Sequence, residues 1–350
     1  MALKQTYDVR VEEFVSLVTP ADLTRELPMT RKAAQTVLAG RETIENILSK
    51  KDKRVLVVVG PCSIHDVDAA LEYAGRLNEL RRRVAATLYL VMRVYFEKPR
   101  TTVGWKGLIN DPRLDGSCDM ETGLHMARKL LLQVTEMGLP TATEMLEPIT
   151  PQYIAGLVSW AAIGARTTES QTHREMASGL SMPVGFKNGT DGDLTMAINA
   201  MVAAGSPQSF LGMDHSGRIS VVKTRGNSWT HLVMRGGSRP NYDSVSIREA
   251  LKLLREKHLI EAIMVDCSHD NSNKDYKNQG VVWHDVINQR IYGNDALIGL
   301  MLESNLNEGN QKLTGDLSTL KYGVSITDSC ISWEATEQLI SSANQQLSRQ

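Results

Sequence analysis

Cations and hydroxyl groups are concentrated in residues 93–107, RVYFEKPRTTVGWKG. The stretch begins inside an apolar run, residues 88–96, of a kind typical of a strand buried in a sheet. Pro99 interrupts the run and is surrounded by two cations and two hydroxyl residues, Lys98, Arg100, Thr101 and Thr102. A solvated basic loop is the alternative, but Arg93 stands inside the apolar run, where an unpaired cation would be costly. We therefore predict a site for a polyanionic ligand here.

The composition is that of an ordinary globular protein. The 350 residues are 42% hydrophobic and 23% charged, and 39 Lys and Arg against 40 Asp and Glu leave a net charge of −1. This balance argues against a nucleic-acid or membrane-surface partner, since both favour a net basic field. We expect a cytoplasmic protein, because we find neither a signal-peptide pattern nor an apolar run of transmembrane length. The four cysteines are widely and irregularly spaced, which does not resemble a disulfide framework.

Strand and helix patterns alternate along most of the chain. Eight short apolar segments, each followed by a helical pattern, are expected to be strands: 54–60, 88–96, 141–145, 160–165, 183–188, 231–237, 262–269 and 296–304. This alternation predicts an α/β fold, specifically a (β/α)8 TIM barrel spanning 51–350. Residues 1–50 are expected to form an N-terminal helical arm, and about 208–227 an inserted β-hairpin. An open doubly wound sheet is the alternative fold, although no G-x-G-x-x-G fingerprint follows the first strand.

Charged side chains stand at the C-terminal ends of the predicted strands, where a barrel places its active site. Six of them are cations: Arg93, Lys98, Arg100, Arg166, Lys187 and Arg235. Converging on one rim they would repel one another, so they imply ligands with several negative charges, such as phosphates and a carboxylate. The alternative is that some are paired with Glu97, Glu144 or Glu169.

A second set at the same rim could hold a metal ion. Its members are Cys62, His269, Glu303 and Asp328. Thiolate, imidazole and carboxylates suit one divalent ion of Mn, Fe, Co or Zn. No CxxC or HExxH pair is present, and a single Cys after a buried strand is usually a packing residue. The other cysteines, Cys118, Cys267 and Cys330, are interpreted as structural. A metal beside phosphate-binding cations would suit an aldol-type reaction.

Several motifs together resemble one known family. They are GPCSIHD (60–66), RVYFEKPRTTVGWKG (93–107), GARTTESQ (164–171), PVGFKNGTDG (183–192), RGG (235–237), DCSH (266–269), ESN with EGNQ (303–311) and SITD (325–328). They closely resemble the bacterial type I 3-deoxy-D-arabino-heptulosonate 7-phosphate (DAHP) synthases over nearly the whole chain. The resemblance implies a metal-dependent (β/α)8 enzyme that condenses phosphoenolpyruvate with erythrose 4-phosphate in the first step of the shikimate pathway.

The resemblance also implies a role for each site residue. Cys62, His269, Glu303 and Asp328 would hold the metal, and phosphoenolpyruvate would lie against Arg93, Lys98, Arg166, Lys187 and Arg235. Erythrose 4-phosphate would be held by Lys98, Pro99, Arg100 and Thr101. Lys98 would act as the acid, with its pKa lowered by neighbouring cations, and water would be positioned near Glu144 and Lys187.

Enzymes similar to this one are inhibited by phenylalanine, tyrosine or tryptophan, and we expect this chain to form a homodimer or homotetramer. The resemblance places the effector near Pro148, Gln152, Ser181 and Phe210, under the N-terminal arm. The sequence around Pro148 most resembles that of the tyrosine-inhibited form, with the phenylalanine-inhibited form as the alternative. Three other functions stay open: a 3-deoxy-D-manno-octulosonate 8-phosphate synthase, a Schiff-base aldolase using Lys187, and a non-catalytic phosphate-binding regulator.

Overall fold

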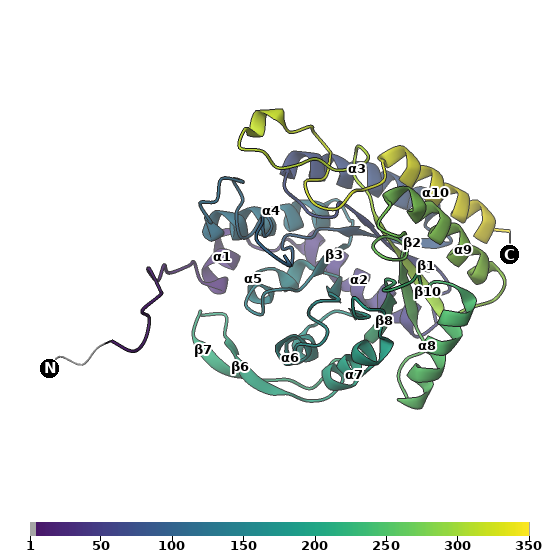
Figure 1. The fold of residues 1–350 in the computed structure, drawn as a ribbon, viewed down its shortest axis with the longest axis horizontal. Coiled ribbons are helices and arrows are strands. Elements are labelled where there is room, and N and C mark those ends of the chain that lie inside the picture. The colour runs from purple at the N-terminus through teal and green to yellow at the C-terminus, as the bar shows by residue number, and fades with distance from the viewer. Residues whose placement is uncertain (1–4, 350) are drawn as a thin grey trace.

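The computed structural model describes residues 5–349 and is built around a closed barrel (Figure 1). Within these residues eight parallel strands close in the order β1-β10-β9-β8-β5-β4-β3-β2. Their bounds are β1 Val55–Gly60, β2 Leu88–Arg93, β3 Thr141–Glu144, β4 Trp160–Ile163, β5 Val184–Lys187, β8 Thr230–Met234, β9 Ile263–Asp266 and β10 Leu297–Glu303. Because β1 pairs with both β2 and β10, the predicted barrel is confirmed and the open sheet is excluded.

Helices cover the outside of the barrel. They are α3 Val67–Val84, α4 Met120–Glu136, α5 Pro151–Ile154, α6 Gln171–Gly179, α7 Leu194–Ala204, α8 Ser244–Glu256, α9 Gln279–Ile291 and α10 Trp333–Leu347. Side-chain caps begin several of them: Asp66, Asp119, Asp243 and Ser332 each accept a hydrogen bond from a first-turn N–H group. Across residues 5–349 no helix is long and apolar enough to cross a membrane.

Several elements are shorter than the sequence predicts. The helical pattern after the strand predicted over 141–145 forms only α5, a single turn continued by a 3-10 turn, Ala155–Leu157. In the helical pattern after the strand predicted over 262–269, Asn273 and Lys274 have φ angles of 54° and 61°, so α9 begins only at Gln279. The strand expected over 88–96 ends at Arg93, and the buried chain then leaves the ladder.

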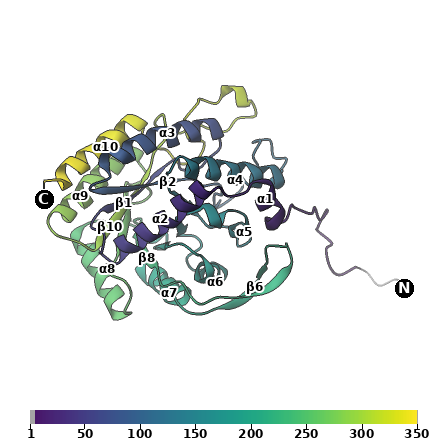
Figure 2. The same ribbon diagram turned by 180° about the vertical axis from the view of Figure 1, so that it is seen from behind.

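The N-terminal segment closes one end of the barrel. Helix α1 (Pro20–Glu26) is followed by α2 (Arg31–Leu48), and the side chains of Thr19 and Thr30 cap them. Ile44, Ile47 and Leu48 of α2 join the apolar cluster that fills the barrel interior. Figure 2 shows α2 lying across this end, so the opposite end, where the strands terminate, is left for a site.

The inserted hairpin is confirmed. Strands β6 (Ser209–Met213) and β7 (Ile219–Lys223) pair in antiparallel register. Asp214 accepts hydrogen bonds from the N–H groups of Ser216 and Arg218, which fixes the turn. The N–H of Ala21 in α1 donates to the carbonyl of His215 at 2.9 Å, so the arm and the hairpin are neighbours.

A buried histidine inside the barrel predicts a loss of stability in acid. His231 on β8 has no exposed surface, and its Nε2 accepts a hydrogen bond from Trp160 Nε1 at 3.2 Å. Burial lowers the pKa of His231 to about 3, against about 6.5 in an unfolded chain. The unfolded state therefore binds more protons between these values, and the contribution of His231 to stability falls as pH drops below about 6.5.

We expect the free energy of unfolding to fall between pH 7 and pH 5 by about 2 kcal/mol more in the wild type than in a His231→Gln variant. Urea titrations of both proteins at the two pH values measure this difference. Equal losses in the two proteins would show that His231 does not contribute to the acid sensitivity.

Candidate active site

A cavity of about 530 Å³ opens at the C-terminal ends of the strands. It is lined by eleven of the predicted site residues: Lys98, Pro99, Arg100, Thr101, Glu144, Arg166, Lys187, Arg235, His269, Glu303 and Asp328. Cys62 and Arg93 are fully buried at the same end of the barrel, in contact with lining residues. Segments far apart in the sequence therefore meet at one mouth.

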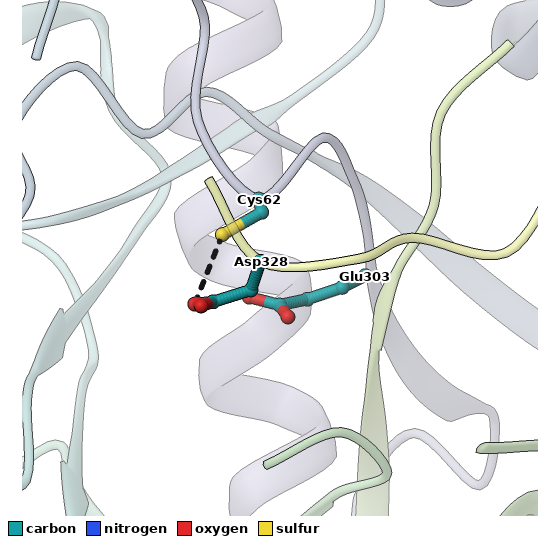
Figure 3. A group of neighbouring side chains, drawn as sticks. All are labelled: Cys62, Glu303 and Asp328. Carbon is teal, nitrogen blue, oxygen red and sulfur yellow. Dashed lines mark hydrogen bonds between the residues drawn. The ribbon is translucent and has the colours of Figure 1, made fainter. Parts of the chain in front are cut away.

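Three of the four predicted metal ligands form a compact group (Figure 3). Donor atoms of Cys62, Glu303 and Asp328 all lie within 4.8 Å of one another, and the Cys62 thiol donates to Asp328 Oδ2 at 3.3 Å. One sulfur and two carboxylates fit a divalent transition ion better than Mg²⁺ or Ca²⁺, which prefer oxygen alone. His269 lies outside this distance group but lines the same cavity.

The environment of Cys62 disfavours its thiolate form. Burial, reinforced by Glu303, raises the pKa of the Cys62 thiol to about 12, although Lys98 acts in the opposite direction. At neutral pH such a thiol is protonated and a poor nucleophile. A metal ion would deprotonate it, because coordination stabilises the thiolate directly.

Arg93, one of the predicted anion-binding cations, contacts the group of predicted metal ligands formed by Cys62, Glu303 and Asp328. Its guanidinium carbon lies 3.9 Å from the centre of the Tyr95 ring, and its Nη2 is 3.1 Å from Glu303 Oε1. Both side chains are buried, so the charge that seemed costly in the sequence is compensated. Arg93 therefore fixes the position of a predicted metal ligand as well as presenting a cation.

Four of the six predicted cations are paired with carboxylates. The pairs are Arg93–Glu303, Lys98–Asp328, Lys187–Asp266 and Arg235–Asp270. None of these partners is one of the expected Glu97, Glu144 and Glu169, so that expectation was wrong in its partners. Arg100 and Arg166 form no ion pair within residues 5–349 and remain available to a ligand.

Comparisons with known proteins agree with this geometry. The family model described as the DAHP synthetase I family matches residues 27–341. The Tyr-sensitive phospho-2-dehydro-3-deoxyheptonate aldolase of Escherichia coli K12 is 54% identical over 343 residues, covering 98% of this chain and 96% of that enzyme. The Phe-sensitive enzyme of the same strain is 53% identical over 336 residues, covering 96% of both. This chain belongs to the DAHP synthetase I family.

A solved structure is similar over almost the same length. The phospho-2-dehydro-3-deoxyheptonate aldolase of Francisella tularensis SCHU S4 superimposes with a TM-score of 0.94 at 44% identity, covering 97% of this chain and 98% of that one. The similarity therefore includes the N-terminal helices and the hairpin as well as the barrel.

The surroundings of Lys98 correct one expectation about this family member. Its Nζ lies 3.0 Å from Cys62 Sγ and 3.8 Å from Asp328 Oδ2. Burial lowers the pKa of Lys98, but Cys62, Asp328 and Glu303 together raise it above its ordinary value. The expected lowering by neighbouring cations is wrong, because the nearest groups are anionic or become so. Lys98 is thus a charged ammonium that donates hydrogen bonds.

Glu144 is aimed into the cavity without a partner. Among the described residues none bonds to its buried Oε1. A Cβ added at Gly164, the residue directly after β4, would lie 2.2 Å from that oxygen. The absence of a side chain at this glycine therefore leaves room for the carboxylate. A buried acceptor left open in this way is suited to bind water or substrate.

Sequence reasoning missed Asp266 and Asn188. Asp266 is the buried last residue of β9 and contacts both Lys187 and His269. Asn188 Oδ1 accepts from the Arg235 N–H at 2.9 Å, and its Nδ2 donates to the Gly236 carbonyl, which joins β5 to β8. Both stand inside motifs that the sequence singled out, but a buried polar residue at a strand end gives no separate signal.

None of the predicted effector residues lines the cavity. Pro148 and Gln152 belong to the segment after β3, Ser181 follows α6 and Phe210 lies on β6. Within residues 5–349 no hydrogen bond joins these four side chains to one another. Neighbouring bonds do connect the segments: Tyr153 Oη donates to the Val18 carbonyl, and Ser178 Oγ is 2.7 Å from Thr224 Oγ1.

The other cysteines differ in environment. Cys267 and Cys330 are buried, in agreement with a structural role. Cys118 is exposed, so its interpretation as a packed residue was wrong.

Proposed function

We propose that the mouth of this barrel performs the family's reaction with the residue roles given below. The enzyme condenses phosphoenolpyruvate with erythrose 4-phosphate to give DAHP and inorganic phosphate, the first step of the shikimate pathway. The observation that carries the role assignment is the shared cavity, where the Cys62, Glu303 and Asp328 donors stand beside a row of cations.

The cations bind and orient the two phosphorylated substrates. Arg166 and Arg235 bind the phosphate of phosphoenolpyruvate, while Arg93 and Lys187 fix its carboxylate end from the buried side. The turn formed by Lys98, Pro99, Arg100 and Thr101 holds erythrose 4-phosphate in the same cavity. Holding both substrates in one cavity replaces a bimolecular encounter by an oriented reaction.

Lys98 and Glu144 handle the protons. As the methylene carbon of phosphoenolpyruvate forms a bond to the aldehyde carbon, the Lys98 ammonium donates a proton to the aldehyde oxygen. A water molecule adds to the adjacent carbon of phosphoenolpyruvate and loses a proton to Glu144, whose Oε1 is otherwise unpartnered. The carbon–oxygen bond to phosphate then breaks while the new hydroxyl passes its remaining proton to the departing phosphate, which leaves the ketone of the product and free phosphate.

The donor set fits one divalent ion of Mn, Fe, Co or Zn per chain, held by Cys62, Glu303 and Asp328 with His269 as the fourth ligand. When bound, such an ion supplies Lewis-acid polarisation of the aldehyde oxygen.

An activity assay with two sugar phosphates tests the proposed function. We expect phosphate release with erythrose 4-phosphate to exceed that with arabinose 5-phosphate at least 100-fold, because the cavity is proposed to orient the four-carbon sugar. EDTA should abolish activity and added Mn²⁺ should restore it. Activity that survives EDTA together with borohydride trapping of Lys187 would instead support a Schiff-base aldolase. That route is disfavoured because Lys187 Nζ forms an ion pair with Asp266 Oδ2 at 2.7 Å.

We propose tyrosine as the feedback effector, bound near Pro148, Gln152, Ser181 and Phe210. Identity alone does not discriminate, since the Tyr-, Trp- and Phe-sensitive enzymes of E. coli are 54%, 52% and 53% identical to this chain. The preference rests on Pro148, which adds little bulk and no N–H and leaves room for a phenol hydroxyl. The same assay with each aromatic amino acid at equal concentration should give strongest inhibition by tyrosine; stronger inhibition by phenylalanine would reverse the assignment.

We propose that residues 1–50 serve as an oligomer and effector arm and that the chain forms a homodimer or homotetramer. Large apolar side chains are exposed on the arm, where Phe14 is 82% accessible, and on the hairpin, where Leu211 is 79% and Ile219 75% accessible. The arm projects from the body beside the hairpin (Figure 1). Neighbouring apolar groups of this size favour burial against a second copy.

Light scattering of the purified protein should report at least twice the 38.7 kDa chain mass. A Phe14→Asp variant should shift the distribution toward monomer, because a charge there would be buried in the contact. A wild-type monomer at micromolar concentration would contradict the proposed assembly.

A further inference from the structure

A buried carboxylate connects the two halves of the candidate site. Asp266 ends β9 and has no exposed surface. Its Oδ2 lies 2.7 Å from Lys187 Nζ and 3.0 Å from His269 Nδ1. Its Oδ1 accepts hydrogen bonds from the N–H of Ser268 at 3.1 Å and from its Oγ at 2.7 Å. One oxygen of this carboxylate therefore contacts both the proposed substrate-site lysine and the candidate metal-site histidine, while Ser268 holds the other oxygen.

We propose that Asp266 is a positioning residue shared by the metal site and the phosphoenolpyruvate site, so that its charge supports binding at both. The inference rests on the proposed function, because it takes His269 as a metal ligand and Lys187 as a contact to phosphoenolpyruvate. It adds a residue that would itself touch neither the metal nor the substrate.

The first step concerns the orientation of His269. Both Asp266 Oδ2 and Ser268 Oγ, which lies 2.7 Å away, face the Nδ1 atom of His269. With Nδ1–H donating to these oxygens, Nε2 carries the free lone pair that a metal needs. His269 also has a φ of 57°, a conformation that a non-glycine residue adopts only when its surroundings hold it.

The second step concerns Lys187. Its side chain is only 5% exposed, and among residues 5–349 its Nζ forms an ion pair with Asp266 alone. A buried ammonium without a partner would be strongly disfavoured. Asp266 therefore fixes the position of Lys187 Nζ at the cavity wall, where it can contact an anionic substrate.

The effects of Asp266 on His269 and on Lys187 are not independent, since Asp266 Oδ2 contacts both His269 Nδ1 and Lys187 Nζ. Replacing this oxygen by an amide nitrogen would remove the acceptor for Lys187 and His269 together. A role through either partner alone would instead affect only one ligand.

The test compares wild type with Asp266→Asn by titration calorimetry, first with Mn²⁺ alone and then with phosphoenolpyruvate at saturating Mn²⁺. The dissociation constant for Mn²⁺ should rise about 10- to 100-fold, the usual effect of losing a carboxylate behind a ligating histidine. That for phosphoenolpyruvate should rise at least about 10-fold, because Lys187 loses its charged partner. Both constants within twofold of wild type would overturn the proposal, and so would a loss of only one.

A matched control separates positioning from general stability. Asp243 caps α8 through the N–H groups of Val245 and Ser246, outside the cavity. Asp243→Ala should lower the melting temperature while both dissociation constants stay within twofold. If Asp266→Asn does not fold, Ser268→Ala provides the same test: it removes a hydroxyl that contacts both Asp266 and His269. It should weaken Mn²⁺ binding severalfold, and unchanged binding would overturn the proposal.

These binding measurements do not depend on turnover. If the wild type binds Mn²⁺ and phosphoenolpyruvate but does not condense erythrose 4-phosphate, the proposed function fails while the role of Asp266 is still measured.

Discussion

A Lys98→Met variant is expected to lose at least about 10³-fold in kcat, because its ammonium is proposed both to protonate the aldehyde oxygen and to stand between the two substrates. Its content of bound metal should stay close to that of the wild type, since a charged ammonium is not a metal ligand. Methionine retains the length and apolar stem of lysine, so the buried packing around Lys98 is largely preserved. Steady-state phosphate release and metal analysis of the same preparation measure the two quantities.

Lys106 offers a matched control. It lies on the same segment, its side chain is exposed and it does not line the cavity. Lys106→Met should keep kcat within a few-fold of wild type. If Lys98→Met kept more than one-tenth of wild-type kcat, Lys98 could not be the acid.

The second large effect is expected from Cys62→Ala, which removes the soft donor from the Cys62, Glu303 and Asp328 group. Metal affinity should fall at least about 100-fold, because two carboxylates and a histidine without the thiolate hold transition ions less tightly. Activity should fall with metal occupancy. The fold should persist, since deleting one buried sulfur costs only a few kcal/mol.

Cys118→Ala is the control for cysteine loss, because Cys118 is exposed and outside the cavity. The metal affinity of Cys118→Ala, measured by titration, and its activity should both match those of the wild type. If Cys62→Ala still bound metal at full occupancy, the Cys62 thiolate could not be one of the metal ligands.

The fold could be predicted from the sequence because its signals are local. Runs such as 55–60 are apolar throughout, as strands buried on both faces must be, and caps such as Thr30 mark where helices begin. The predicted element boundaries are wrong where the local sequence pattern gives no signal. Helix α9 starts late because Asn273 and Lys274 adopt left-handed conformations that only the surrounding loop dictates.

The candidate site could be predicted in its members but not in its pairings. Strand ends meet at one mouth in any barrel, so Cys62 and Glu303 were expected to be near one another. Which carboxylate pairs with which cation depends on side-chain direction, and Asp266 was missed for that reason. The wrong direction for the pKa of Lys98 has the same cause, because the groups that raise it, Cys62, Asp328 and Glu303, come from three separate segments.

The central claim, that these distant segments build one metal and substrate site, is tested most directly by a crystal structure with Mn²⁺ and phosphoenolpyruvate. Anomalous scattering should give one peak per chain, about 2.0–2.5 Å from donor atoms of Cys62, His269, Glu303 and Asp328. The phosphate of phosphoenolpyruvate should contact Arg166 and Arg235 in the same cavity. A metal peak bonded to other residues, or a substrate bound on another face, would contradict the account.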